Sequence, residues 1–75
     1  MTIHLRIDEF AHLSAARGHR TYEQQATSTR VGIATIHRLR NGGPADSRTI
    51  AKILTAYGVG FDDLFAIRSD TAAAA

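Results

Sequence analysis

The sequence predicts an all-α fold, a compact bundle of four to five short helices, and it allows a short extended segment at the N-terminus. Three observations lead to this prediction. The chain has 75 residues, which is enough for one small core. Apolar residues recur at helical spacing in several short runs, each bounded by a capping residue or by glycine. The sequence also lacks cysteine, so the fold has to be stable without disulfides.

The first elements are predicted in the N-terminal 18 residues. Apolar and polar residues alternate over residues 2–7, which is typical of a short extended segment with one buried face. Asp8 is then predicted to be the N-cap of a helix that runs to about Arg17 and ends at Gly18.

Two short helices are predicted in the middle of the chain. Thr21 and Gln24 have the spacing of a capping box, so a second helix should begin there. A third helix is expected from about Ile33 to Asn41, and the glycine pair and proline of residues 42–44 should end it. The inner face of the second helix is predicted to hold Tyr22, Ala26 and Thr29.

The last helices lie in residues 46–65. Asp46 or Ser47 should cap a fourth helix, which Gly58 closes after an apolar face typical of a core helix. A last helical turn is predicted over residues 61–65. The folded domain is therefore placed at residues 1–67, and residues 68–75 are predicted to form a disordered or frayed tail.

The spacing between the second and third helices carries the functional information. Ala26, Val31, Ile36 and Leu39 are five, five and three residues apart. In a helix-turn-helix, a small residue lets the helices approach, the next apolar residue fills the turn, and the last two anchor the second helix. We therefore predict a helix-turn-helix over about residues 21–41.

The outward face of its second helix should then contact duplex DNA. Such a helix fits the major groove, where Arg38 can donate two hydrogen bonds to guanine and the apolar side chains can pack on thymine methyl groups. Arg30, Arg38 and Arg40 are expected to surround this face. The predicted base-reading residues are Ile33, Ala34, His37 and Arg38. The predicted phosphate contacts are Thr21, Tyr22, Arg30, Asn41 and Arg48.

A wider set of residues has the order and spacing of a known family. The set comprises Ala26, Val31, Thr35-Ile36, Arg38-Leu39, Asn41-Gly42, Pro44, Gly58-Val59 and residues 61–65. With these residues, the chain resembles the phage-repressor and Cro-type helix-turn-helix family, also called the xenobiotic-response-element family. The resemblance covers residues 21–65, or most of the chain if residues 10–18 form the family's first helix. It implies a five-helix fold that binds operator DNA sequence-specifically, usually as a dimer.

The chain departs from the family pattern at the turn and in the helix before it. Arg30 stands where the family usually has a turn glycine, and that position often needs positive φ. Gln25 and Thr29 replace the usual leucines, so the second helix is expected to be loosely held. Tyr22 replaces a glutamine that many members place beside the DNA backbone.

Other classes of function find little support in the sequence. No apolar run is long enough to span a membrane, and no signal peptide, phosphate-binding loop or nucleophile motif is present. The four histidines lack the spacing of zinc ligands. We therefore expect no enzyme activity, cofactor, metal, membrane partner or small-molecule substrate.

The sequence thus favours a transcriptional regulator, a repressor or Cro-like protein whose partner is double-stranded operator DNA. Its expected location is the cytoplasm of a bacterium or of a phage-infected host. The net charge of +2 is compatible with this partner but does not require it. Two alternatives remain: a protein-interaction module with an antitoxin-like or accessory role, and the DNA-binding domain of a longer repressor. A homodimer is also left open, either through pairing of the 3–7 segments across a two-fold axis or by other means.

Overall fold

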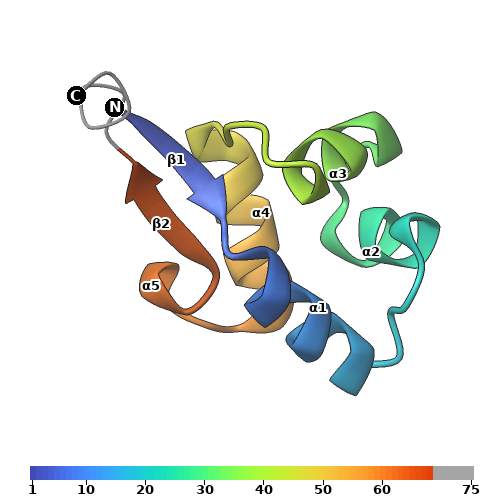
Figure 1. The fold of residues 1–75 in the computed structure, drawn as a ribbon. Helices are drawn as coiled ribbons and strands as arrows, with labels where there is room; N and C mark the ends of the chain where they lie inside the picture. Colours follow the sequence, from blue (N-terminus) through green and yellow to red (C-terminus); the bar gives the residue numbers. More distant parts are fainter. Residues whose placement is uncertain (69–75) are drawn as a thin grey trace.

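The structure is a computed structural model, in which residues 1–68 are described. This part of the chain folds into five helices and one two-stranded sheet (Figure 1). The elements are β1 (Thr2–Leu5), α1 (Ile7–Ala16), α2 (Tyr22–Thr29), α3 (Ile33–Arg40), α4 (Ser47–Tyr57), α5 (Phe61–Leu64) and β2 (Phe65–Arg68). The prediction of a small helical bundle is confirmed, but the fold is mostly helical and not all-α, because the sheet is part of it.

The first helix begins two residues earlier than predicted. Arg6, and not Asp8, is the N-cap residue of α1, and its side chain makes no capping hydrogen bond. The Arg6 N–H donates to the Leu64 carbonyl at 2.7 Å, which holds this residue in the extended conformation that an N-cap needs. Asp8 lies in the first turn instead, where its charge faces the positive end of the helix.

The starts of α2 and α4 agree with the predicted caps. The Thr21 hydroxyl accepts from the Gln24 N–H at 3.1 Å, and the Gln24 side chain accepts from the Thr21 N–H at 3.2 Å. This is the predicted capping box. The Asp46 carboxylate caps α4 by accepting from the Thr49 N–H at 2.8 Å. At the other end of α4, Gly58 takes the left-handed conformation as its C-cap.

The sheet was not fully anticipated by the sequence. β1 pairs antiparallel with β2, from Thr2 opposite Arg68 to Leu5 opposite Phe65. The predicted last helical turn therefore ends at Leu64, and Arg68 belongs to β2 and not to a tail. The remaining residues of the predicted tail, 69–75, lie outside the described part of the chain.

Both edges of β1 are occupied within the chain. β2 covers one edge, and on the other the Ala45 N–H donates to the Ile3 carbonyl at 2.7 Å. His4 also forms an isolated bridge with Pro44. Pairing of β1 with a second copy of the chain, one of the routes to a homodimer that the sequence left open, would therefore require these internal contacts to break.

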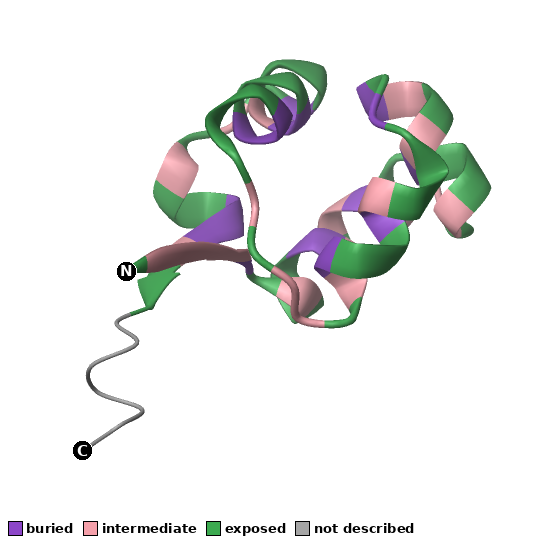
Figure 2. Cartoon of the chain, turned by 90° about the horizontal axis from the view of Figure 1, so that it is seen from above, coloured by how far each residue is buried: buried purple, intermediate pink, exposed green. Residues whose placement is uncertain are grey.

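A single core joins the elements. Figure 2 shows buried positions on the inward sides of the helices, and Figure 1 shows the sheet at one end of the molecule and the α2–α3 pair at the other. The core residues are Leu5, Phe10, Val31, Ile36, Leu39, Ile50, Ile53, Tyr57, Leu64 and Phe65. Within residues 1–68, no helix has both the length and the apolar character needed to cross a membrane.

Candidate nucleic-acid interface

α3 is attached to the core by one narrow stripe. Ile36 and Leu39 are buried, as is Val31 in the three-residue connection that follows α2. Ala26 of α2 packs against the same core. The predictions that Ile36 and Leu39 anchor α3 and that Val31 is the apolar residue of the turn are confirmed by their burial. The four predicted base-reading residues Ile33, Ala34, His37 and Arg38 lie away from this stripe and are all exposed.

Arg38 is held at the C-terminal end of this outward face by a close approach to Gly43. The Gly43 N–H donates to the Arg38 carbonyl at 2.8 Å. A Cβ atom on Gly43 would lie only 2.6 Å from the Arg38 Cγ atom. Glycine is therefore required at position 43 if the aliphatic part of the Arg38 side chain is to keep this position. The Arg38 side chain itself is exposed.

Arg38 and Arg48 both act on the carboxylate that caps α4. The hydrogen bond from the Thr49 N–H is the main cause that lowers the pKa of Asp46 below its ordinary value of 3.8, and a bond from the Thr49 hydroxyl adds to it. Limited desolvation opposes this shift, while the positive charges of Arg38 and Arg48 lower the pKa further. Two predicted DNA-contacting cations are therefore close enough to this anionic helix cap to act on its charge.

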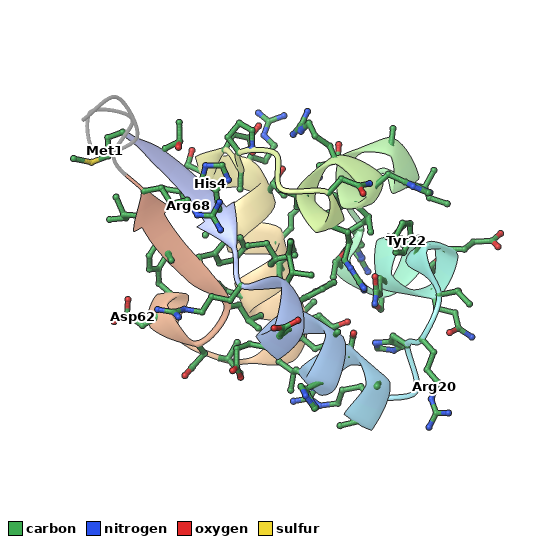
Figure 3. The ribbon with its side chains drawn as sticks, in the orientation of Figure 1. Met1, His4, Arg20, Tyr22, Asp62 and Arg68 are labelled. Carbon is green, nitrogen blue, oxygen red and sulfur yellow. The ribbon has the colours of Figure 1, made fainter. Side chains whose placement is uncertain are left out.

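The start of α2 meets the outward face of α3 through an aromatic contact. The ring centroids of Tyr22 and His37 are 4.3 Å apart, with the rings almost perpendicular. Figure 3 shows Tyr22 between α2 and α3. Tyr22 is half-buried, and the other eight predicted site residues are exposed. Thr21 beside it is exposed, but its hydroxyl oxygen already accepts the capping hydrogen bond.

Arg40 was expected to be one of the cations around the outward face, but it turns inward instead. It is half-buried, and its guanidinium carbon lies 5.1 Å from the centroid of the Tyr22 ring. Its Nη1 atom donates to the Gln25 side chain at 3.3 Å. The sequence could have indicated the inward position of Arg40, because Arg40 follows the buried Ile36 by four residues and so shares its face of the helix.

The remaining predicted phosphate contacts flank α3. Asn41 follows its C-terminus, and the Asn41 side chain donates to the His37 carbonyl at 2.7 Å. Arg30 precedes α3 and takes a left-handed conformation with φ 61°. Lys52 of α4, which the sequence did not single out, donates to the Arg30 carbonyl at 3.3 Å. Within residues 1–68, no hydrogen bond or ring contact joins the Thr21 or Arg30 side chain to another predicted site residue.

Charge is unevenly distributed along the chain. Residues 24–61, which begin within α2 just after Glu23 and end at the start of α5, contain five basic residues and one acidic residue, a net charge of +4. The rest of the chain contains four basic and six acidic residues, a net charge of −2. Asp62 of α5 lies at the end of the molecule opposite to α2 and α3 (Figure 3). The net charge of +2 is therefore the sum of an acidic remainder and a basic middle segment, and the basic segment contains the exposed face of α3.

Comparison with known proteins gives no match: no family model, no curated protein and no solved structure matches the chain significantly.

Proposed function

We propose that the protein is a sequence-specific double-stranded DNA-binding regulator that uses α2 and α3 as a helix-turn-helix. It would act as a repressor by occupying an operator. The observation that carries the proposal is the outward face of α3. This face is exposed along its length, lies within the basic segment of the chain, and is fixed to the core by Ile36 and Leu39 on the other side.

In the proposed complex, α3 enters the major groove. The exposed Arg38 side chain donates to a guanine edge, while Ile33 and Ala34 pack on thymine methyl groups in the first turn. His37 lies between these two parts of the face. Thr21 lies at the N-terminus of α2, an end of a helix that favours phosphate groups, and Arg48 at the start of α4 offers an exposed positive charge. Arg30 and Asn41 flank α3 as further phosphate contacts.

The test begins with selection of duplexes bound by the wild type from a random pool. Affinities for the selected duplex and for a random duplex of equal length are then measured across a salt series. We expect Arg38→Ala to lose about 1–3 kcal/mol of preference for the selected duplex. Arg48→Ala should weaken binding to both duplexes alike and reduce the slope of log K against log salt by about 0.9. Equal affinity of the wild type for both duplexes at every salt concentration would overturn the proposal.

One observation favours a second candidate, a protein-interaction module on the same fold. Ile33 is 47% exposed, which is unusual for a large apolar side chain on a face expected to read polar base edges. Such a module would neither be retained on heparin nor shift promoter DNA in a gel. The sequences selected by the wild type also report half-site symmetry, and thus whether two copies bind together.

A further inference from the structure

A chain of polar contacts connects the core to the outward face of α3. It begins at Ser14, which is fully buried in α1 and donates from its hydroxyl to the Phe10 carbonyl at 2.7 Å. Gln25 of α2, 1% exposed, donates from Nε2 to the Ser14 hydroxyl oxygen at 3.0 Å. It donates more weakly to the His19 carbonyl at 3.4 Å. These bonds fix the orientation of the amide, so its oxygen points toward Arg40.

Arg40 continues the chain from α3. Its Nη1 atom donates to the Gln25 Oε1 atom at 3.3 Å, and its guanidinium carbon lies 5.1 Å from the centroid of the Tyr22 ring. The Nε atom is buried without a hydrogen-bond partner, and no carboxylate of residues 1–68 forms an ion pair with this side chain. The planar guanidinium group is therefore held by one amide and one aromatic face, which a lysine ammonium could not reproduce.

Tyr22 connects Arg40 to a side chain on the surface of α3. Its ring contacts both the Arg40 guanidinium group and the His37 imidazole, whose centroid is 4.3 Å away. His37 is exposed on the outward face of α3. The buried amide of Gln25 and a side chain of the candidate interface are thus linked through two intermediate groups.

We propose that Gln25 and Arg40 are positioning residues for DNA recognition, and this inference rests on the proposed function. They lock α2 against α3 and hold Tyr22, and through it the imidazole of His37, in one orientation toward the groove. α2 has eight residues and buries Gln25 and Thr29, so it cannot rely on its own apolar face for a fixed angle. The hydrogen bonds that Gln25 makes to Ser14, His19 and Arg40 supply that angle, because hydrogen bonds are directional and apolar contacts are not. Arg40 does not bind phosphate in this arrangement.

The salt dependence of binding separates positioning from phosphate contact. We expect Arg40→Gln to lower affinity for the selected duplex about tenfold, with unchanged affinity for random DNA and an unchanged salt slope. Arg40→Lys keeps the charge but should show the same loss. Arg68→Gln is the matched control, because it removes an equal charge from β2 at the opposite end, and it should bind as the wild type. A slope reduced by about 0.9 for Arg40→Gln, with both duplexes weakened alike, would make Arg40 a phosphate contact and overturn the inference.

A double-mutant cycle tests whether the two residues act together. Gln25→Leu should reduce preference for the selected duplex as Arg40→Lys does, and the double variant should lose little more than either single one. Additive losses would show that the residues act independently, which contradicts the inference. If the wild type itself shows no preference, the proposed function fails. If the wild type discriminates and Arg40→Lys discriminates equally well, this inference alone fails.

A spectroscopic measurement on the free protein covers the case in which a variant is destabilised. The edge-on contact with Tyr22 should displace the His37 imidazole proton resonances through the ring current. Arg40→Lys, at a temperature where circular dichroism shows it folded, should move these resonances toward their values in an unstructured peptide. Arg68→Gln should leave them in place. Unchanged His37 resonances in folded Arg40→Lys would overturn the positioning role.

Discussion

At the scale of single residues, Arg30 stores backbone strain at the turn between α2 and α3. It is the only non-glycine residue with positive φ among residues 1–68. Its N–H donates to the Ala26 carbonyl, and its own carbonyl accepts from the Lys52 side chain at 3.3 Å. The left-handed conformation costs a residue with a Cβ atom about 1–2 kcal/mol. The turn needs this conformation, because the next residue, Val31, has to enter the core.

We expect Arg30→Gly to raise the free energy of unfolding by about 1 kcal/mol, because glycine adopts positive φ without a steric penalty. Arg30→Ala is the control, since it removes the same charge but keeps the Cβ atom. Urea denaturation of the three proteins measures the difference. Equal stability of the glycine and alanine variants would show that the turn is not strained. Both variants should weaken DNA binding equally if the guanidinium group contacts phosphate.

At the scale of elements, α4 is bounded at both ends by well-formed caps. The Asp46 carboxylate accepts from the Thr49 N–H at its start, and Gly58 ends it in the left-handed conformation. These local signals explain why its bounds could be predicted. The hydrogen bonds from Thr49, followed by the charges of Arg38 and Arg48, lower the pKa of Asp46 in the folded protein. The ionised cap therefore stabilises the fold.

A lowered pKa means that this stabilisation is present above the ordinary value of 3.8 and is lost as the pH falls through the lower folded value. We expect the wild type to be more stable than Asp46→Asn near neutral pH, because asparagine caps a helix but has no charge to attract Arg38 and Arg48. The difference should shrink as the pH drops below 3.8. Thermal denaturation of both proteins over a pH series measures it, and the other carboxylates contribute equally to both. A difference that does not vary with pH would contradict this account.

At the scale of the whole molecule, the sheet ties the two ends of the described chain to the helices. Phe65 of β2 is fully buried and Leu5 of β1 nearly so. From β1, the His4 side chain bonds the Gly42 carbonyl at 2.9 Å, just beyond the end of α3. The sheet therefore supports the turn after α3, in which the Gly43 N–H donates to the Arg38 carbonyl. Such a sheet should unfold with the helices in one cooperative transition.

We expect Phe65→Ala to lower the free energy of unfolding by about 3–5 kcal/mol, because it leaves a cavity in the core. That loss is a large share of the stability of a small domain. Ile67→Ala is the matched control in the same strand. Ile67 is 59% exposed, so the change should stay within about 0.5 kcal/mol. Urea denaturation followed by circular dichroism distinguishes them. An unchanged urea midpoint for Phe65→Ala would mean that β2 does not contribute to the stability of the helical part of the fold.

The sequence by itself determined the features that depend on neighbours along the chain. The capping box at Thr21, the cap at Asp46 and the left-handed glycine at position 58 each involve residues within one helical turn, so their signals are local. The anchors Ile36 and Leu39 follow from helical periodicity in the same way. The outward face of α3 could be assigned because burial of one stripe of a helix exposes the other.

Only the tertiary structure decided the features that depend on distant partners. β2 is a strand because β1, some sixty residues earlier, offers it an edge, and Arg6 caps α1 because Leu64 accepts its N–H. Arg40 turns inward because its guanidinium group contacts the Gln25 amide and the Tyr22 ring, both on another helix. Hydrogen bonds and ring contacts between elements need particular atoms at particular distances, and spacing along one helix gives only the face on which a residue lies.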